Sequence, residues 1–308
     1  MGSEMCIRDS GNFEGWRRAG SKQKWLEVHG DTHFTHFYSK YGEALQKRFF
    51  GHFLKGENTG WESQPPVALN IRHPGETFVR RAEREWPLKR TRWTKYFLEP
   101  DGLVLGTTPP AGATVLSYET TGDGLTFRTP PLSAPLEITG PVAAKLWVSS
   151  QTTDADLFLV LRVFDPAGKE VVFIGSNDPR VPVGLGWLRA SQRKLDRDRT
   201  LPYRPWHTHD EEWPLTPNES VELDVEIWPT SIVVPAGYRL ALSVRGNDYE
   251  YDGTDAGLAN APYPMKGVGP FTHTQPDDRP GAVFACRNTL HFTEGKMPYV
   301  LLPVIPEA

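Results

Sequence analysis

From residue 67 onward the chain is a succession of short strand-like runs, and this pattern constrains its fold more than any other feature. The runs cover residues 67–72, 94–98, 125–128, 136–139, 142–149, 157–164, 170–174, 221–228, 238–245, 288–293 and 299–302. Gly or Pro bounds each run, and no long helical pattern lies among them. Such a pattern is typical of an antiparallel β-sandwich. We therefore predict a mainly β fold for residues 61–308, with the strand arrangement of a jelly roll.

Turns and long irregular stretches divide these runs. Asp165-Pro166-Ala167-Gly168 separates two apolar runs and predicts a hairpin between residues 157–164 and 170–174. Residues 176–220 and 246–280 show no strand pattern, and stretches of that length usually cover or line something. They carry the aromatic residues Trp206, Trp213, Tyr249, Tyr251 and Tyr263. These side chains could line a substrate cleft, but sealing an interface between domains is the favoured interpretation.

Before residue 61 the pattern is different. A short apolar run, Trp25 to Val28, leads into a polar turn that carries histidines. A helix is predicted next, from Ser39 as N-cap to Gly56 as the residue that ends it. Its apolar stripe recurs every four residues and needs a sheet or another helix to cover it; it consists of Tyr41, Leu45, Phe49 and Phe53.

The first ten residues do not continue this organisation. Met5 to Ser10 resembles the translation of a transposon adapter used in sequencing libraries. We therefore interpret residues 1–10 as a non-native segment and exclude them from the fold. The alternative is a disordered native N-terminus.

Composition excludes several classes of function. The net charge of −4 suggests neither nucleic acid nor an anionic membrane as a partner. The two cysteines, Cys6 and Cys286, lie at opposite ends of the chain, which argues against a disulfide framework and a cysteine-based metal site. No apolar run reaches the ~18 residues that a membrane-spanning helix needs. No cofactor is expected, and the localisation cannot be read, although the cytoplasm is weakly favoured.

Several motifs, in order, resemble the CocE/NonD family of serine hydrolases, which includes cocaine-esterase-like and X-Pro dipeptidyl-peptidase-like enzymes. The strand, histidine turn and helix come first and end in Phe50-Gly51-His52-Phe53-Leu54-Lys55-Gly56. The other matching stretches are Ser149-Ser150, 154–157, 163–168, 186–191, 235–240 and 273–280. The resemblance covers Asn12 to Pro306.

The resemblance implies an α/β-hydrolase domain with a Ser-Asp-His triad and a C-terminal jelly roll beside the active site. Only the end of such a hydrolase domain, residues 11–60, matches this chain. Gly-x-Ser-x-Gly, the turn that carries the nucleophile in this fold, does not occur. The triad Ser and Asp precede the His in chain order, so both are expected upstream of Gly11.

The same resemblance assigns the catalytic base. The family's histidine follows the strand's valine by about five residues and comes after Ser or Thr, and Val28, Thr32 and His33 match that pattern. His33 is therefore the predicted general base, with His29 as the alternative and His36 behind it. Without the family, His33 would be read as a polar turn residue.

Metal binding is the other chemistry that these residue types allow. His29, His33 and His36 could form a zinc cluster, but Gly30 and Asp31 interrupt any helix that would align them. Residues 207–212, His-Thr-His-Asp-Glu-Glu, are denser in possible ligands but are more often a solvated loop. Asp154 and Asp156 could hold calcium, although capping of a turn is the commoner role. No metal is predicted.

The sequence thus predicts the C-terminal portion of a serine ester or amide hydrolase, inactive alone, whose partner is a missing N-terminal catalytic domain. Its substrate would be a small ester, amide or peptide, of unreadable identity. Two alternatives stay open, a free-standing jelly-roll binding module and a structural accessory domain. The strand and helix of residues 25–55 argue against both, because neither would need them.

Overall fold

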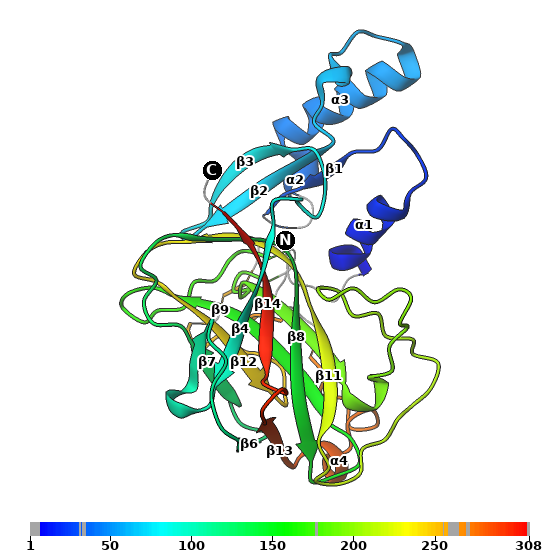
Figure 1. Ribbon diagram of the computed structural model, residues 1–308. Coiled ribbons are helices and arrows are strands. Elements are labelled where there is room, and N and C mark those ends of the chain that lie inside the picture. Colours follow the sequence, from blue (N-terminus) through cyan, green and yellow to red (C-terminus); the bar gives the residue numbers. More distant parts are fainter. Residues whose placement is uncertain are drawn as a thin grey trace.

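Two layers of antiparallel strands form the body of the protein. The computed structural model describes residues 7–30, 32, 35–175, 178–254, 256–257, 265–268 and 272–306. The layer at the front of Figure 1 contains β4 (Arg92–Glu99), β14 (Tyr299–Ile305), β8 (Leu136–Ser150) and β11 (Val221–Val234), in this order. The second layer contains β7 (Leu125–Arg128), β12 (Arg239–Arg245), β9 (Asp156–Phe164) and β10 (Gly184–Arg189). The predicted mainly β sandwich is confirmed.

Shorter elements complete the sandwich. β5 (Val104–Gly106) pairs with β4 and meets β7, so it links the two layers. β13 (Arg287–Phe292) pairs with β6 (Thr114–Glu119) and with the end of β8. Four short helical turns lie in the connections: Trp61–Ser63, Asp101–Leu103, Ala190–Gln192 and α4 (Gly281–Phe284).

The core lies between the layers. Alternate residues of β11 point into it, including Leu223, Val225 and Ile227, each fully buried. In β9, eight of nine positions are buried, because one face of the strand packs into the core and the other face is covered by residues such as Tyr249 and Val268. Strands covered in this way read as continuous apolar runs, which is why β8 and β9 are readily recognised in the sequence.

The structure corrects part of the strand prediction. Residues 170–174 do not form a return strand; only isolated bridges occur, such as Phe164 to Glu170. The reason is that β10 pairs with residues 156–161 on this edge of β9, so the returning segment pairs only with the end of the strand, at Val163 and Phe164. The predicted runs 136–139 and 142–149 are one strand, β8. Four strands were not predicted, namely β3 (Thr77–Glu83), β5, β6 and β10.

A smaller unit lies at one end of the sandwich (Figure 1). β2 (Val67–His73) forms a hairpin with β3, and β1 (Leu26–Val28) pairs with β2 in parallel, Leu26 opposite Val67. α1 (Ile7–Arg18) lies nearby, where Phe13 stacks on Trp86 with ring centroids 4.5 Å apart. Residues before and after position 60 are therefore in contact. The predicted domain boundary at residue 60 stays a prediction.

The predicted helix is confirmed as α3 (Lys40–Lys55), preceded by the single turn α2 (Thr35–Tyr38). The Ser39 hydroxyl accepts a hydrogen bond from the Gly42 N–H, as an N-cap does. Gly56 ends the helix with φ 69°, a left-handed conformation that glycine adopts without strain. None of the helices in the described part of the chain has the length and apolar character needed to cross a bilayer.

A buried arginine ties the β2–β3 hairpin to the sandwich. Arg72 is 3% exposed, and its guanidinium donates hydrogen bonds to the carbonyls of Ser231 (3.0 Å) and Val183 (2.8 Å) and to the Thr230 hydroxyl. Its guanidinium lies 4.4 Å from the centre of the Phe173 ring. Burial lowers the pKa of Arg72 to about 10. Charged groups are buried at a cost unless fully hydrogen-bonded, so these bonds specify how the hairpin docks.

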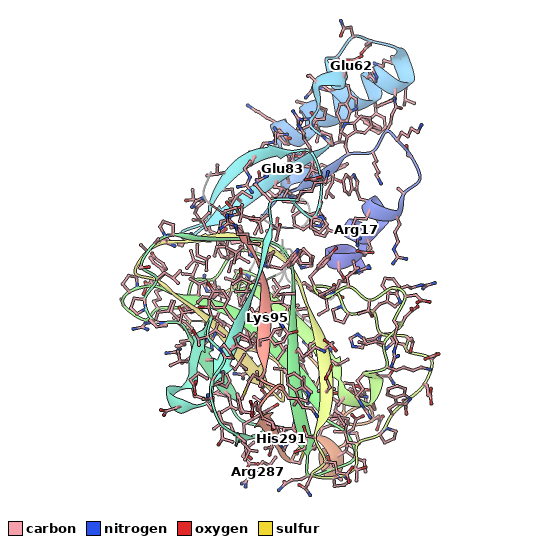
Figure 2. The ribbon with its side chains drawn as sticks, in the orientation of Figure 1. Arg17, Glu62, Glu83, Lys95, Arg287 and His291 are labelled. Atoms are coloured by element: carbon pink, nitrogen blue, oxygen red, sulfur yellow. The ribbon has the colours of Figure 1, made fainter. Side chains whose placement is uncertain are left out.

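A second ionic link lies nearer the surface. Arg81 of β3 bonds bidentately to Glu137 of β8, at 2.8 and 2.7 Å, and contacts Glu83 at 2.7 Å. Figure 2 labels Glu83 in the β2–β3 hairpin of the end unit, and Arg90 forms a further ion pair with it. Bidentate arginine–carboxylate pairs fix orientation as well as adding attraction. Hairpin and sandwich are thus held as one body.

Candidate functional site

The turn after β1 is the candidate site, and its predicted base, His33, lies outside the described residues, as do Asp31 and Phe34. The entry to the turn is fixed by close packing. A Cβ on Gly30 would lie 2.1 Å from the Phe78 ring of β3, so a larger residue here would require that ring to move. The end of β1 is therefore pressed against the hairpin, with His29 immediately before the contact.

His29 and His36 lie against each other beside this turn. Their rings are stacked with centroids 3.8 Å apart and planes 14° apart. The Nδ1 of His29 lies 3.1 Å from the Gly30 carbonyl oxygen, which holds a proton on Nδ1. Burial lowers the pKa of His29, and the neighbouring His36 lowers it further. His29 is therefore a neutral imidazole at pH 7, which is the form that a general base requires.

Glu27 organises the polar groups under the two histidines. Its carboxylate lies 3.3 Å from the Nε2 of His36 and 3.7 Å from the Arg80 guanidinium. The Arg80 guanidinium also lies 4.7 Å from the centre of the Tyr41 ring. Burial raises the pKa of Tyr41, and the Glu27 carboxylate raises it further. The structure thus brings two of the three histidines together, and the carboxylate engages His36 rather than His29.

These groups lack a nucleophile. Among the described residues, no serine hydroxyl is hydrogen-bonded to the ring of His29 or of His36; the hydroxyl of Ser39, three residues after His36, donates to the His36 backbone carbonyl and caps α3. An imidazole without a hydroxyl or thiol to activate cannot form an acyl-enzyme. The described part of the turn supplies base chemistry alone.

An apolar groove of about 560 Å³ lies between β1 and α3. Its apolar walls are Trp25, Leu26, Leu45, Phe49, Phe50 and Trp61. Trp25 and Trp61 meet edge to face at 5.3 Å, and Phe49 meets Trp61 at 5.1 Å. β1 has a strand partner only on the β2 side in the described structure. The helix stripe is therefore partly covered, by two tryptophans, and partly open.

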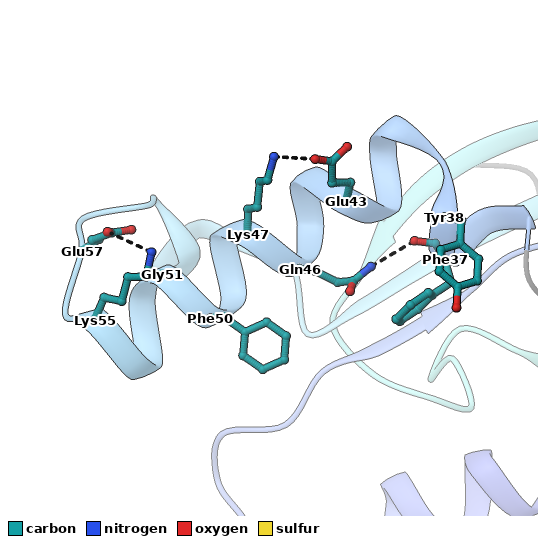
Figure 3. Close-up of a pocket in the computed structure, with 9 residues that line it drawn as sticks. All are labelled: Phe37, Tyr38, Glu43, Gln46, Lys47, Phe50, Gly51, Lys55 and Glu57. Carbon is teal, nitrogen blue, oxygen red and sulfur yellow. Dashed lines mark hydrogen bonds and ion pairs between the residues drawn. The ribbon is translucent and has the colours of Figure 1, made fainter.

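A hollow of about 710 Å³ adjoins this groove along α3 and shares Phe37, Gln46 and Phe50 with it (Figure 3). Phe37 is 53% exposed there and Phe50 49%. The charged groups pair with one another along the helix, Lys47 with Glu43 at 2.5 Å and Lys55 with Glu57 at 3.7 Å. Apolar side chains that gather at a surface mark a contact with another chain or domain.

A serine–histidine pair occurs elsewhere. The Ser149 hydroxyl lies 2.8 Å from the Nε2 of His291, across β8 and β13. Figure 2 shows His291 at the end of the sandwich opposite Glu62, which lies beside α3. No described carboxylate contacts His291, and no pocket described here includes the pair. A triad needs a third group to orient the imidazole, so we regard this pair as a structural contact.

The aspartates proposed as calcium ligands have other partners. Asp154 accepts hydrogen bonds from the backbone N–H groups of Ala155 (2.8 Å) and Ser191 (2.9 Å), which confirms the turn-capping interpretation for this residue. Asp156 is not a cap: its carboxylate pairs with Arg189 and Arg279, each at 2.8 Å. In the histidine-rich loop, Lys194 pairs with Asp210 and Glu211. Over the described ranges, no cluster of three or more His, Cys, Asp or Glu residues could hold a metal ion.

The aromatic residues of the two long stretches do not gather on one surface. Tyr249 is buried at 1% exposure, Trp213 is 39% exposed, and Tyr263 lies outside the described residues. Trp206 packs against α1, with the Arg18 guanidinium 4.5 Å from its ring centre. The interpretation that these residues seal an interface between domains stays a prediction. The sequence reasoning missed a cavity beside Trp187 and Trp228, whose signal was that Trp228 lies on the outward face of β11.

Comparison with known proteins shows what the chain is similar to. The family model of the X-Pro dipeptidyl-peptidase C-terminal non-catalytic domain matches residues 59–297. A protein named as a serine esterase in Mycobacterium bovis is 29% identical over 242 residues, which are 67% of this chain and 36% of the esterase. Cocaine esterase from Rhodococcus is 24% identical over 248 residues, 68% of this chain and 39% of that enzyme. The chain thus spans less than half the length of these relatives.

Solved structures agree over a longer range. A CocE/NonD family hydrolase from Staphylococcus aureus superposes with a TM-score of 0.84 and 26% identity, over 96% of this chain and 52% of that one. An α-amino acid ester hydrolase superposes with a TM-score of 0.56 and 17% identity, over 84% and 44%, and shares the fold. The first match extends beyond residues 59–297, so it includes elements on the N-terminal side of the sandwich.

Proposed function

Because the chain belongs to the family of X-Pro dipeptidyl-peptidase C-terminal non-catalytic domains and resembles the C-terminal portion of CocE/NonD hydrolases, we propose that it is part of a serine ester or amide hydrolase. The nucleophilic Ser and the triad Asp come from a catalytic part upstream of Gly11. In the complete enzyme the Ser attacks the acyl carbon, and water hydrolyses the acyl-enzyme. The substrate is a small ester, amide or peptide.

One observation carries this proposal: β1, the histidine turn and α3 precede the non-catalytic domain and present an uncovered side. The groove of about 560 Å³ beside the free edge of β1 has the shape and apolar character that another strand and its side chains would fill. A catalytic domain placed there would bring its nucleophile to the turn that carries the histidines.

Within that turn we assign the general base to His33, with His29 as the alternative. The base must take the proton of the serine hydroxyl while its other nitrogen is held by a carboxylate. His29 fits less well, since its Nδ1 already faces the Gly30 carbonyl and its ring is stacked on His36. His36 is occupied by Glu27.

A binding module or a structural accessory domain remains the rival function. The non-catalytic character of the family domain agrees with either role. Neither role gives a reason for the strand, histidine turn and helix of residues 25–55, and so the hydrolase assignment is preferred.

Two measurements test the proposal. The purified chain is expected to hydrolyse no p-nitrophenyl ester above background, because a base without its nucleophile loses most of the acceleration. Turnover that a serine-directed phosphonate abolishes would contradict it. The genomic sequence upstream of Gly11 is expected to encode Gly-x-Ser-x-Gly in the same frame; a stop codon in its place would favour the binding module.

A further inference from the structure

A second cavity, which we call the indole pocket, lies beside β9, β10 and β11, away from the histidine turn. It has a volume of about 470 Å³, which is in the range of small-molecule sites. The side chains that define it are Phe158, Trp187, His207, Glu226, Trp228 and His273. They come from three strands and from the two long irregular stretches, so the fold rather than one local motif builds the pocket.

Glycines in β10 create the aromatic wall of the pocket. A Cβ on Gly186 would lie 2.3 Å from the Glu226 carbonyl oxygen, and one on Gly184 would lie 3.3 Å from Ile227. Glycine at these positions lets β10 approach the backbone of β11. As a result Trp187 and Trp228 meet at an angle of 62° with ring centroids 4.8 Å apart. The two indole rings thus form two adjoining walls of the pocket, set at an angle to each other.

A fixed histidine extends this wall. Asp248 accepts hydrogen bonds from the backbone N–H of His273 (2.6 Å) and faces its Nδ1 at 2.9 Å. The imidazole therefore has one orientation, with its ring centre 5.4 Å from Phe158 and 6.4 Å from Trp187. Four aromatic rings thus line one continuous surface.

The polar groups of the pocket are not all satisfied. The Nε2 of His207 is buried and has no hydrogen-bond partner among the residues that the structure describes. Burial lowers the pKa of His207 to about 4, so the ring is neutral at pH 7. Burial also raises the pKa of Glu226 to about 7. A buried acceptor and a buried carboxyl at a cavity are groups that a ligand can satisfy.

The charge of the lining favours a cation. Three carboxyl groups line the pocket, those of Asp156, Glu226 and Asp278, against the single guanidinium of Arg189. Asp156 and Asp278 both pair with Arg189, and Asp156 also pairs with Arg279 behind the wall. Arg204, the cation that acts on Glu226, is itself paired with Glu14. Glu226 accepts a hydrogen bond from the Ser10 side chain, but among the described residues it has no arginine at hydrogen-bond distance, so it is the one carboxyl of the three whose charge no arginine pairs with directly.

We propose that the indole pocket binds a small organic cation, an alkylammonium or quaternary ammonium group. The positive charge lies against the faces of Trp187 and Trp228, and the Glu226 carboxylate is its counter-ion. Indole faces attract cations more strongly than other aromatic rings do, and boxes of aromatic rings recognise quaternary ammonium groups in this way. The proposal does not depend on the hydrolase assignment.

Isothermal titration of the whole chain with choline tests the pocket, and 3,3-dimethylbutan-1-ol, which has the same shape without the charge, is the matched ligand. Choline is expected to bind in the millimolar range and the neutral alcohol at least about tenfold more weakly. Equal binding of the two would mean that the pocket recognises shape alone and would overturn the proposal. So would the absence of choline binding at 100 mM.

Single substitutions test whether choline binds in the indole pocket. Trp228→Ala and Glu226→Gln are each expected to weaken choline binding at least about fivefold, whereas Trp93→Ala, an exposed tryptophan on β4 stacked on Tyr203, is expected to leave it unchanged. Circular dichroism checks that each variant folds. Should Trp228→Ala unfold, Glu226→Gln decides alone, and unchanged affinity in that variant would overturn the proposal.

Discussion

β9 and α3 are the two most contrasting elements of this protein. In β9, eight of nine residues are buried between neighbouring strands and the opposite layer. In α3, the only buried residues are Gly42 and Gly51, while Phe53 and Leu54 are 39% and 76% exposed. Both sequences are rich in apolar residues, so composition does not explain the difference. What differs is the covering: neighbouring strands and the opposite layer cover β9, whereas the smaller unit covers only part of the surface of α3.

The contrast teaches which region is complete. In the described part of the chain, the sandwich core is a large cluster of buried residues from both layers, and the charged Arg72 has hydrogen-bond partners within the sandwich. The end unit supplies a strand with a free edge, a groove and a turn with paired histidines. We infer that stability resides in the sandwich and that the chemistry of the end unit depends on a further partner.

The largest expected effect concerns the histidine turn. In a protein with the upstream region restored, His33→Ala is expected to lower kcat by about three to six orders of magnitude, because the nucleophile loses its base. His29→Ala is the matched control and is expected to be far milder. Steady-state kinetics with an activated ester measure both. A silent His29→Ala enzyme beside an active His33→Ala enzyme would move the assignment to His29.

The next effect compares the two regions directly. Leu159→Ala in β9 removes a fully buried side chain and is expected to cost about 2–5 kcal/mol of unfolding free energy. Phe53→Ala in α3 removes a partly exposed ring and is expected to cost less than about half as much, since less apolar area returns to water. Urea denaturation monitored by circular dichroism gives both values. Equal costs would show that the groove beside α3 is filled in solution.

The third effect is a pH dependence inside the sandwich. Glu226 has a pKa raised by burial to about 7, so the folded protein keeps its proton after the unfolded chain has lost it. Stability from this group therefore falls as the pH rises from about 4.5 to 7. When the pH is lowered from 7 to 4.5, the unfolding free energy of the unsubstituted protein is expected to rise by about 2–3 kcal/mol relative to that of the Glu226→Gln variant.

His207 acts in the opposite sense over nearly the same range. Its pKa is lowered by burial to about 4, so the unfolded chain binds a proton first and stability falls as the pH drops below about 6.5. The contributions of Glu226 and His207 to the pH dependence of stability nearly cancel in the unsubstituted protein. In the Glu226→Gln variant only the contribution of His207 is left. Urea denaturation midpoints of both proteins, measured at several pH values, give the difference. If the midpoints of the two proteins change with pH in parallel, the pKa of Glu226 is not raised in the folded protein.

The sequence allowed prediction of those helices and strands whose sequence patterns lie within one continuous stretch. α3 was predicted with both caps, because Ser39, Gly56 and a four-residue apolar spacing all lie within one stretch. β9 was predicted because a strand buried on both faces is a continuous apolar run. By contrast, β3 is exposed along most of its length and contains two adjacent arginines, so its pairing with β2 leaves no apolar period.

The candidate sites needed contacts between distant residues. The resemblance of Val28, Thr32 and His33 to a family motif identified the turn, but the stacking of His29 on His36 depends on how α2 folds back. The indole pocket depends on Gly186 lying against the backbone of β11, forty residues away in sequence number. A single sequence does not display which backbones approach one another.

The smallest expected effect is that of removing residues 1–60. The sandwich keeps its core and the Arg72 bonds that hold the β2–β3 hairpin, and it loses the ion pair of Arg204 with Glu14. The thermal transition is therefore expected to shift by no more than about 2–4 °C, the change that ~1 kcal/mol makes in a domain of this size. Loss of the helix with its exposed apolar side chains is expected to decrease aggregation. The structure adds an opposing term, because the cut also uncovers the edge of β2 and the face of Trp86 that Phe13 covers. Size-exclusion profiles of the truncated chain, with and without Trp86→Gln, separate the two terms. An unfolded truncated chain would show instead that the end unit is part of the core, and the boundary at residue 60 would fail.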